Sequence, residues 1–386
     1  MGALGRRIAG DLRRHVGFFV ILWAVPALAA AGYYLLAIVA VIRWRRPARR
    51  AVTLPPVSVL KPMYGKDARL YQAIRSHAAQ DYPEFEILFG VGNSADPAIA
   101  EIQRLQTEFP DRSLRLVVVK PDAPNAKVAV LSELAKQARY ELLVVNDDDI
   151  VAAPDYLRSV VAALENKETG LVTCLYRAYT RSFASLIEGL GVATEFAPSV
   201  MVARLLGVVD FALGSTMALR AETLQKIGGF QPLGNFLADD YQLGRSVAAH
   251  GNRVEFASVV VETGSGNATW GQMWRHQLRW SRTIRVSRQA GYYGSVVTQA
   301  TVWGLIAIVA GQVWAGAAAL VLRIVAGLLA GGIILEDVNV WRWFWLMPVR
   351  DLFGFAVWLG GCFGSTVYWR GRKLRLGADG RISEER

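Results

Sequence analysis

Hydrophobic positions gather in three long stretches of the chain, with a segment of mixed polar and apolar composition between the first two. The first stretch, residues 18–42, has no charged residue and is long enough to cross a bilayer core of about 30 Å. The second, residues 296–335, has Arg323 as its only charged residue, and the third, residues 344–369, is interrupted by two adjacent charges. The pattern predicts membrane helices on both sides of a polar domain.

A cleaved signal peptide is the alternative interpretation of residues 18–42. The apolar core of a signal peptide is only about 7–15 residues long and is followed by small residues. The stretch here is longer and ends in a run of arginines within residues 43–50, which is typical of the flank of a retained membrane helix. We predict a transmembrane anchor over 18–42, after a basic N-terminus (1–17) and before a basic linker (43–56).

Short β-branched runs alternate with helical patterns in the mixed segment. Strands are expected at 57–60, 86–91, 114–119 and 141–145, and helices at 69–79, 99–109, 128–138 and 154–164. This alternation predicts an α/β domain with a doubly wound, mostly parallel sheet. Such sheets bind ligands at the carboxyl ends of their strands, and acidic residues follow the second and fourth strands there.

Asp147 and Asp149 form an Asp-x-Asp motif directly after the apolar strand at 141–145. Two carboxylates at this spacing can converge on one hard cation, Mg²⁺ or Mn²⁺, which would neutralise the two phosphates of a nucleotide sugar. A solvated acidic turn is the alternative, since aspartate is common in turns. The position after a strand, together with two motifs farther along, favours the metal site.

The first of these motifs is the pair Asp239 and Asp240, which precedes a helix expected at 243–249. An aspartate at this position can cap the helix, and a carboxylate there can also act as a general base toward an attacking hydroxyl. The two roles fit different residues, so we expect Asp239 to cap the helix and Asp240 to point into the cleft.

The second motif is His276-x-x-Arg279-Trp280, which lies among further arginines and tryptophans. This composition predicts an amphipathic helix at the membrane interface, over residues 271–292. An interfacial helix remains compatible with Arg279 binding a phosphate and Trp280 packing on a sugar or base.

Composition adds little to this interpretation. The net charge of +11, from 43 Lys and Arg against 32 Asp and Glu, could suggest nucleic acid, but the arginines crowd beside the apolar stretches, where they orient a membrane protein. We therefore expect no nucleic-acid partner. Two cysteines provide neither a disulfide framework nor a metal-binding spacing.

Together the motifs resemble the glycosyltransferase family 2 enzymes of GT-A fold, and more narrowly the ceramide-glucosyltransferase group, family 21. That group has an Asp, an Asp-x-Asp-like motif, a [Glu/Asp]-Asp pair and [Gln/Arg]-x-x-Arg-Trp. The matching stretches are residues 60–62, 65–67, 80–83, 96–99, 125–127, 147–150, 214–217, 228–230, 239–241 and 368–372. The resemblance covers nearly the whole chain and implies a GT-A catalytic domain with N- and C-terminal transmembrane helices.

The resemblance also implies roles for individual residues. The substrate-binding residues would be Asp96, Lys127, Gly214, Ser215, His276, Arg279 and Trp280. Asp96 would contact the uridine of a UDP-sugar donor and Lys127 would help to hold the nucleotide. Asp147 and Asp149 would hold the diphosphate through the metal ion. Asp240 would be the base of an inverting transfer to a lipid hydroxyl, with Asp239 as the next candidate.

His276 departs from the ceramide pattern, which has Gln or Arg at this position. With residues 173–177 and 197–200, the histidine looks like the bacterial branch associated with hopanoid biosynthesis, which implies transfer of N-acetylglucosamine to a bacteriohopanepolyol. A ceramide glucosyltransferase is the alternative, and a processive polysaccharide synthase is a more distant one. A non-enzymatic membrane scaffold would leave the spaced acidic motifs without a purpose.

These expectations place the chain in the bacterial inner membrane as a multi-pass protein. A cytoplasmic catalytic domain would cover residues 57–270, and the interfacial helix would follow it. Beyond this helix we expect a transmembrane hairpin or two spans over 293–335, a membrane segment over 344–369 and a basic tail over 370–386.

Overall fold

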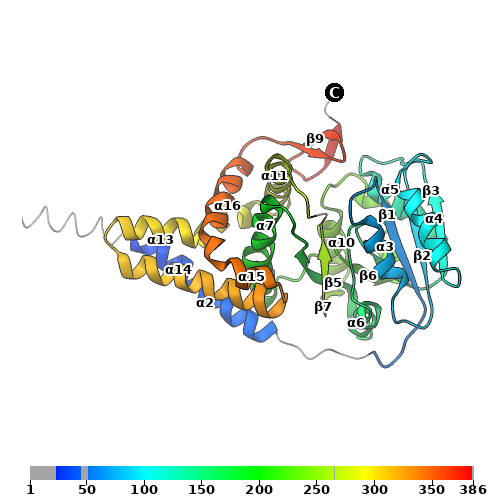
Figure 1. Cartoon of the computed structure of the whole chain (residues 1–386), viewed down its shortest axis with the longest axis horizontal. Coiled ribbons are helices and arrows are strands. Elements are labelled where there is room, and N and C mark those ends of the chain that lie inside the picture. Colours follow the sequence, from blue (N-terminus) through cyan, green and yellow to red (C-terminus); the bar gives the residue numbers. More distant parts are fainter. Residues whose placement is uncertain (1–22, 45–50, 265, 385–386) are drawn as a thin grey trace, which may run out of the picture.

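The computed structural model describes residues 23–44, 51–264 and 266–384. An α/β domain occupies one side of the molecule, and a group of apolar helices projects from the other (Figure 1). The expected basic N-terminus over 1–17, the start of the expected anchor and residues 45–50 of the expected linker lie outside the described residues.

A seven-stranded sheet with the order β3-β2-β1-β4-β6-β5-β7 forms the centre of the α/β domain. Its strands are β1 (Val57–Met63), β2 (Phe85–Val91), β3 (Ser113–Val118), β4 (Leu142–Val145), β5 (Thr169–Ala178), β6 (Met217–Arg220) and β7 (Arg253–Thr263). Neighbouring strands pair in parallel except β6, which is antiparallel to β4 and β5. The expected mostly parallel sheet is confirmed.

Helices cover both faces of this sheet. They include α3 (Leu70–Ala78), α4 (Ala98–Glu108), α5 (Ala126–Gln137), α6 (Tyr156–Leu164), α9 (Ala221–Lys226) and α10 (Asp239–Ala249). Because side chains alternate across a strand, Val59 of β1 joins the core under α3, α4 and α6, whereas Leu60 joins the core under α5 and α10. The four predicted strands and four predicted helices are confirmed, with ends shifted by up to three residues. Strands β5, β6 and β7 were not predicted.

Three helices are long and apolar enough to cross a membrane, judged by length and composition within the described residues: Ala24–Trp44, Phe183–Leu205 and Val313–Ile334. The first is α2, which extends two residues past the predicted end of the anchor. The last comprises α14 (Val313–Gly327) and the π-helical segment η4 (Leu328–Ile334). A bent pair, Gln289–Thr298 with α13 (Ala300–Val309), would make a fourth span. Together these candidate spans indicate a membrane protein, and α13 and α14 pack against each other as a helical hairpin.

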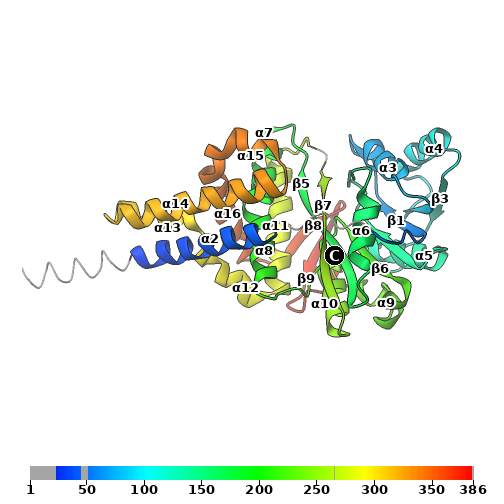
Figure 2. The ribbon, with the colours of Figure 1, turned by 90° about the horizontal axis from the view of Figure 1, so that it is seen from below.

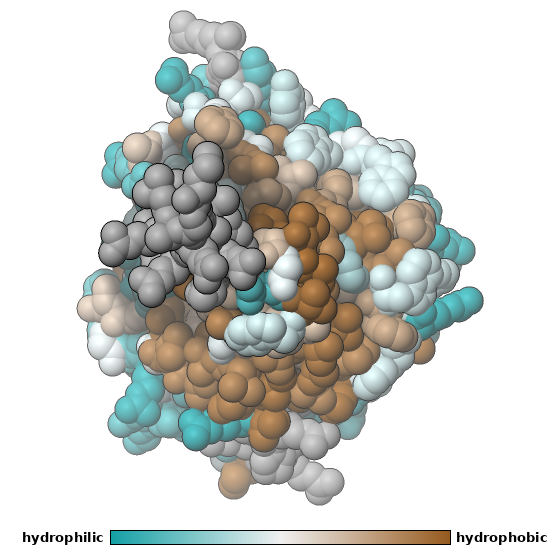
Figure 3. Space-filling view, turned by 90° about the vertical axis from the view of Figure 1, so that its left-hand side faces the viewer, coloured by the Kyte–Doolittle hydropathy of each residue, from teal (hydrophilic) through white to brown (hydrophobic). Residues whose placement is uncertain are grey.

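Apolar side chains cover the projecting end of the molecule (Figure 3). Large hydrophobic residues exposed on α2, α13 and α14 include Leu28, Leu35, Ile42, Leu305, Val309, Val313, Trp314 and Val321. A surface of this kind is stable in lipid and unstable in water. Figure 2 shows α2, α13 and α14 extending away from the sheet on one side.

The helix Phe183–Leu205 lies inside the stretch for which we expected a catalytic domain. It comprises α7 (Phe183–Gly191), the π-helical turn η1 (Val192–Phe196) and α8 (Ala197–Leu205). Of its most apolar window, 72% is buried within the molecule, and its side chains share one hydrophobic core with those of α2 and α14. The α/β domain and the projecting apolar helices are therefore packed together through this helix.

The expected membrane segment over 344–369 is not one continuous helix. Residues 347–361 form α16 (Met347–Gly361), after the short α15 (Val338–Trp343), and the chain then enters strand β8 (Thr366–Trp369). Strands β9 (Arg372–Leu376) and β10 (Ile382–Glu384) complete an antiparallel three-stranded sheet where we expected a basic tail. This small sheet packs on α11 (Trp270–Ser287), the helix that we expected at the membrane interface, where Arg282 Nη1 donates to the carbonyl oxygen of Thr366 at 2.5 Å.

Arg323 of α14 forms an ion pair inside the apolar helices. Its side chain is 1% exposed, and its guanidinium donates to Asp351 Oδ1 at 2.7 Å and to the carbonyl oxygen of Thr194 at 2.8 Å. Asp351 also accepts a hydrogen bond from the hydroxyl of Thr301 at 2.6 Å. The ion pair thus joins α14, α16, α13 and η1.

Replacing Arg323 with methionine is expected to lower the free energy of unfolding by about 3–5 kcal/mol, because the Asp351 carboxylate would stay buried without its partner. Unfolding of the detergent-solubilised protein would measure the loss. Lys136→Met, which removes an exposed partner of Glu133 (3.2 Å), is the control and should leave stability unchanged within error. Equal stability of the two variants would contradict the assignment.

Candidate active site

The carboxyl ends of β1, β4 and β7 meet at one edge of the sheet, beside a cavity of about 970 Å³. The acidic motifs line this cavity. Apolar side chains line it as well, such as Val200 of α8, Phe211 of the loop after α8 and Ile284 of α11. One cavity therefore connects a cluster of carboxylates to the helix that packs against the membrane helices.

Asp147, Asp148 and Asp149 follow β4 and all line the cavity. The Asp149 carboxylate accepts hydrogen bonds from the Thr263 hydroxyl (2.7 Å) and the Gly264 N–H (2.8 Å), both at the end of β7. Under the cluster, the fully buried Lys61 donates to the carbonyl oxygen of Asp147 at 2.9 Å. The strands thus fix the backbone from which the Asp147 carboxylate projects.

Like charges are crowded in this cluster. Burial and the neighbouring Asp149 raise the pKa of Asp148 to about 7, and burial and Asp147 raise the pKa of Asp149. Crowded carboxylates of this kind are stabilised by a divalent cation. No group of three or more His, Cys, Asp or Glu arranged for a metal occurs within the described ranges. Asp147 and Asp149 stay the predicted ligands of such a cation, whose remaining ligands would be substrate phosphates and water.

Lys127, at the start of α5, bridges two of the acidic motifs. Its Nζ lies 2.7 Å from Asp147 Oδ1 and 2.9 Å from Asp239 Oδ2. Burial by itself would lower the pKa of Lys127, but the carboxylates of Asp147, Asp239 and Asp240 outweigh it and raise the pKa. The lysine is therefore a fixed positive charge beside the acidic motifs of the cavity.

Asp239 does not cap α10, contrary to our expectation. The N-cap position is Ala238, and Asp239 stands inside the first turn of the helix, 5% exposed and paired with Lys127. An ion pair with a buried lysine is a stronger partner for a carboxylate than the helix end alone. Asp239 therefore supports Lys127.

Asp240 is the neighbouring carboxylate and points into the cavity. Its oxygens accept hydrogen bonds from the backbone N–H groups of Gly214 (2.9 Å) and Tyr241 (2.7 Å). A side chain at Gly214 would collide with the Asp147 carboxylate, since a Cβ there would lie 2.9 Å from Asp147 Oδ2. Glycine at this position thus lets Asp147 and Asp240 approach each other. Burial and Asp239 raise the pKa of Asp240 to about 6.

The His276-x-x-Arg279-Trp280 motif lies on α11, and all three residues line the cavity. His276 Nδ1 lies 2.6 Å from Glu188 Oε1, an oxygen that also accepts from Gln277 Nε2 at 2.9 Å. The rings of His276 and Trp280 are 4.5 Å apart. Burial lowers the pKa of Arg279, an effect that the nearby Asp147 and Asp240 oppose.

Two of the predicted substrate residues use their side chains in contacts within the protein. Ser215 lines the cavity, but its hydroxyl donates to the carbonyl oxygen of Cys174 at 3.0 Å. Asp96 is absent from the cavity wall. Its oxygens each lie 3.1 Å from the Gly65 N–H, and Oδ1 accepts from the Ala98 N–H, so Asp96 fixes the loop that brings Asp67 to the cavity.

Sequence reasoning missed several residues of the site. Glu188 is a single acid in an apolar stretch, and no spacing pattern marks it. Trp369 and Arg370, which we assigned to a membrane segment and a basic tail, also line the cavity, and their occurrence in the matching stretch 368–372 was the available signal. Lys61 likewise lies in a matching stretch, residues 60–62, and had no predicted role of its own.

Comparison with known proteins identifies the family of this chain. The profile of Glycosyl transferase family 21 matches residues 21–382. Ceramide glucosyltransferase 1 of Caenorhabditis elegans is 26% identical over 276 residues, 70% of this chain and 59% of that protein. The ceramide glucosyltransferase of Komagataella phaffii is 26% identical over 188 residues, 46% of this chain and 36% of that protein. The chain spans about three-fifths or less of these relatives' length.

Among solved structures, the mannosyltransferase PcManGT from Pyrobaculum calidifontis, in complex with GDP-Man and Mn²⁺, superposes with a TM-score of 0.55 at 20% identity. The match covers 89% of this chain and 99% of that chain. This likeness confirms the expected GT-A-type fold.

Proposed function

The chain is a glycosyltransferase of family 21, and from this membership we propose that it moves a sugar from a UDP-sugar to a membrane-lipid hydroxyl with inversion. The observation that supports this proposal is the mixed lining of the cavity. Its charged side chains suit a diphosphate, and its apolar side chains include those of α8, which packs against the candidate membrane helix α2. A lipid acceptor can thus present its hydroxyl to the donor while its chain stays in apolar surroundings.

At the donor end, Asp147 and Asp149 would hold a Mg²⁺ or Mn²⁺ ion. Such a cation supplies charge neutralisation for the departing diphosphate. The Mn²⁺ bound by the similar mannosyltransferase supports this assignment. Lys127 and Arg279 bring two positive side chains to the same end of the cavity, where they suit diphosphate oxygens.

The reaction would be a single in-line displacement. Asp240 takes the proton of the acceptor hydroxyl, and the oxygen attacks the anomeric carbon from the face opposite UDP. The bond from that carbon to the diphosphate breaks, and its electron pair leaves with UDP. An α-linked donor therefore gives a β-linked glycolipid.

For the acceptor, we propose a bacteriohopanepolyol that receives N-acetylglucosamine, because His276 stands where ceramide enzymes have Gln or Arg. Glu188 and His276 together supply a polar pair on the acceptor side of the cavity, which suits a polyhydroxylated lipid. Ceramide with UDP-glucose is the second candidate, supported by the curated relatives.

Incubation of the full-length enzyme with each UDP-sugar and each lipid, followed by mass spectrometry of the extracted lipids, tests these assignments. N-Acetylglucosaminyl hopanoid as the main product would support the first candidate, and glucosylceramide the second. Hydrolysis of UDP-sugars without any modified lipid would contradict the proposal.

His276→Gln is expected to keep turnover within about tenfold of wild type, because glutamine can still donate a hydrogen bond to Glu188 and one such bond is worth about 1 kcal/mol. We expect the KM for the lipid to change more than the KM for the UDP-sugar. His250→Gln, at the exposed end of α10, is the control. A loss as large as that of Asp240→Asn, in folded protein, would show that His276 takes part in the chemistry.

We further propose that the enzyme resides in a bacterial inner membrane with its catalytic domain on the cytoplasmic side. Support comes from the candidate spans and from the arginines that follow residue 42. Protease accessibility of the catalytic domain in inverted, but not in right-side-out, membrane vesicles would agree with this orientation.

A further inference from the structure

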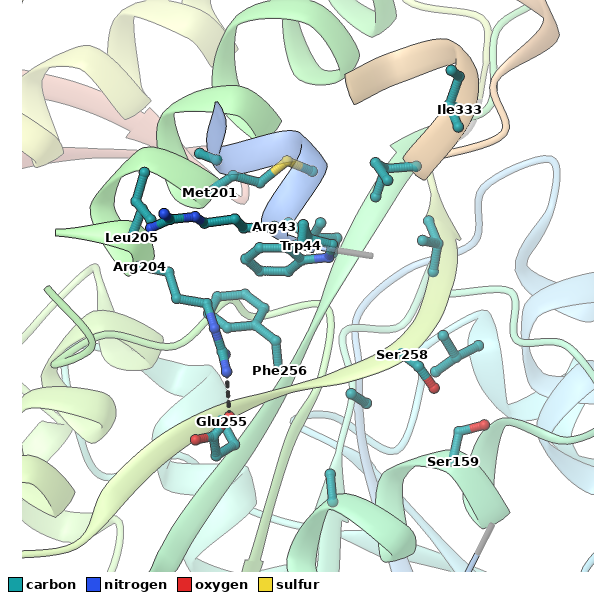
Figure 4. A pocket seen from close by; sticks show the side chains of 17 residues that line it. Arg43, Trp44, Ser159, Met201, Arg204, Leu205, Glu255, Phe256, Ser258 and Ile333 are labelled. Atoms are coloured by element: carbon teal, nitrogen blue, oxygen red, sulfur yellow. Dashed lines mark hydrogen bonds and ion pairs between the residues drawn. The ribbon is translucent and has the colours of Figure 1, made fainter. Parts of the chain in front are cut away.

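A second cavity, of about 520 Å³, lies apart from the active site and shares none of its lining residues. It is bounded by α2, α6, α8, β7 and η4 (Figure 4). Helix α8 separates the two cavities, with Ala203 on the active-site side and Arg204 on the other.

The position of this cavity is set by two candidate membrane spans. Arg43 and Trp44, the last residues of α2, form part of its wall, as do Ile333 and Ile334, the last residues of Val313–Ile334. Both spans therefore end at this cavity, where they meet strand β7 of the catalytic domain. Tryptophan and arginine at the end of a span are typical of the headgroup level of a membrane.

Arg204 provides a partly unused hydrogen-bond donor in this cavity. Its Nη2 donates to Glu255 Oε2 at 2.5 Å, whereas its Nη1 is buried and has no hydrogen-bond partner among the described residues. Its guanidinium carbon lies 5.4 Å from the ring centre of Trp44 and 5.6 Å from that of Phe256. The two rings and the Glu255 carboxylate hold the guanidinium in place, so the Nη1 group is fixed within the wall of the cavity.

Charge and hydroxyl groups in the wall favour an anionic ligand. The wall carries two arginines, Arg204 and the exposed Arg43, against one carboxylate, Glu255, while Ser159 and Ser258 add hydroxyl donors. Figure 4 shows Arg43 beside Leu205 and Arg204 turned toward Glu255, with Ser159 and Ser258 on the other side of the cavity. Phosphate is the anion that a membrane presents at this level, and arginine binds it through parallel N–H donors.

We propose that this cavity binds the headgroup phosphate of an anionic glycerophospholipid whose acyl chains lie along α2 and the helix Val313–Ile334. The bound lipid joins the membrane spans to β7 and so fixes the catalytic domain against the bilayer. The apolar residues Ala40, Met201 and Ile333 of the wall contact the glycerol and the upper part of the chains.

Native mass spectrometry of the full-length protein, titrated with an equimolar mixture of phosphatidylglycerol and phosphatidylcholine, tests this proposal. We expect wild type to retain phosphatidylglycerol preferentially as its most tightly bound lipid. Arg43→Gln and Arg204→Gln should each lower that preference about fivefold, the effect of one basic residue at an anionic membrane surface. Arg245→Gln, at an exposed position of α10, should not lower it. Because Arg43 is exposed, its variant keeps the test valid if Arg204→Gln fails to fold.

Three results would overturn the proposal. One is the absence of a preference for phosphatidylglycerol in wild type, and another is an unchanged preference in folded Arg43→Gln. The third is displacement of phosphatidylglycerol by millimolar inorganic phosphate, which would identify a site for free anions. None of these results bears on the glycosyl transfer, whose residues line the other cavity.

Discussion

Replacing Asp240 with asparagine is expected to lower kcat by about 10²–10⁴-fold, the usual contribution of a general base. An alcohol is a poor nucleophile until its proton is removed. The carboxylate of Asp240 lines the cavity and is held there by hydrogen bonds from the backbone N–H groups of Gly214 and Tyr241. The nearby alternatives have other partners, since Asp239 is paired with Lys127 and Asp149 is bonded to Thr263. An amide keeps the shape of the side chain but cannot accept the proton.

The pH dependence of the transfer activity is a second test of Asp240 as the base. A base acts in its ionised form, and the pKa of Asp240 is raised to about 6 by burial and Asp239. Wild-type activity should therefore be present above about pH 6 and be lost as the pH falls through it, and Asp240→Asn should lack this limb. UDP-sugar binding should change little, and Asp81→Asn, on the exposed surface, is the control. Wild-type turnover in Asp240→Asn would require another base, with Asp239 next.

Removal of divalent cations is the second change with a large expected effect. Transfer should fall at least about 10²-fold in excess chelator, because several kcal/mol of charge stabilisation at the diphosphate would be lost. Added Mn²⁺ or Mg²⁺ should restore it. The reason lies in the crowded carboxylates after β4, where burial and like charge raise the pKa values of Asp148 and Asp149.

Variants of Asp147 and Asp149 test whether these residues bind the required cation. Asp147→Asn and Asp149→Asn should need at least about 10–100-fold more cation for half-maximal activity. Mutation of a residue that only hydrogen-bonds to a metal ligand already weakens metal binding by about this factor. Asp81→Asn should respond to the cation like wild type. Full activity in chelator, by protein shown to retain no metal, would remove the metal from the mechanism.

The parallel half of the sheet could be predicted because its signals are local. The runs at 57–60, 86–91 and 142–145 are buried on both faces, and the run at 114–119 forms the half-buried edge strand. All four appear as short apolar segments separated by amphipathic helices. The Asp-x-Asp motif was placed correctly because the carboxyl ends of parallel strands share one edge of the sheet. The reversal at β6 has no comparable signal, since it depends on long-range pairing with β4 and β5.

Hydropathy was less informative where apolar segments are buried by protein rather than by lipid. The helix Phe183–Leu205 passes as a membrane span by length and composition, yet 72% of its most apolar window is buried in the molecule. Conversely, residues 366–369 continue the apolar run of α16 but pair with β9. Apolar character alone does not distinguish these environments. Glu188 was missed for the same reason, because its role arises only when α7 meets α11.

Transfer of the sugar to a lipid is tested most directly with the full-length enzyme in vesicles that contain a hopanoid or ceramide acceptor. The enzyme is given a UDP-sugar that carries the label in its sugar. We predict that label moves into the organic phase as a lipid carrying one β-linked sugar, and that Asp240→Asn slows this transfer by about 10²–10⁴-fold. Label that stays in the aqueous phase as free sugar, or appears in a polymer, would contradict the account.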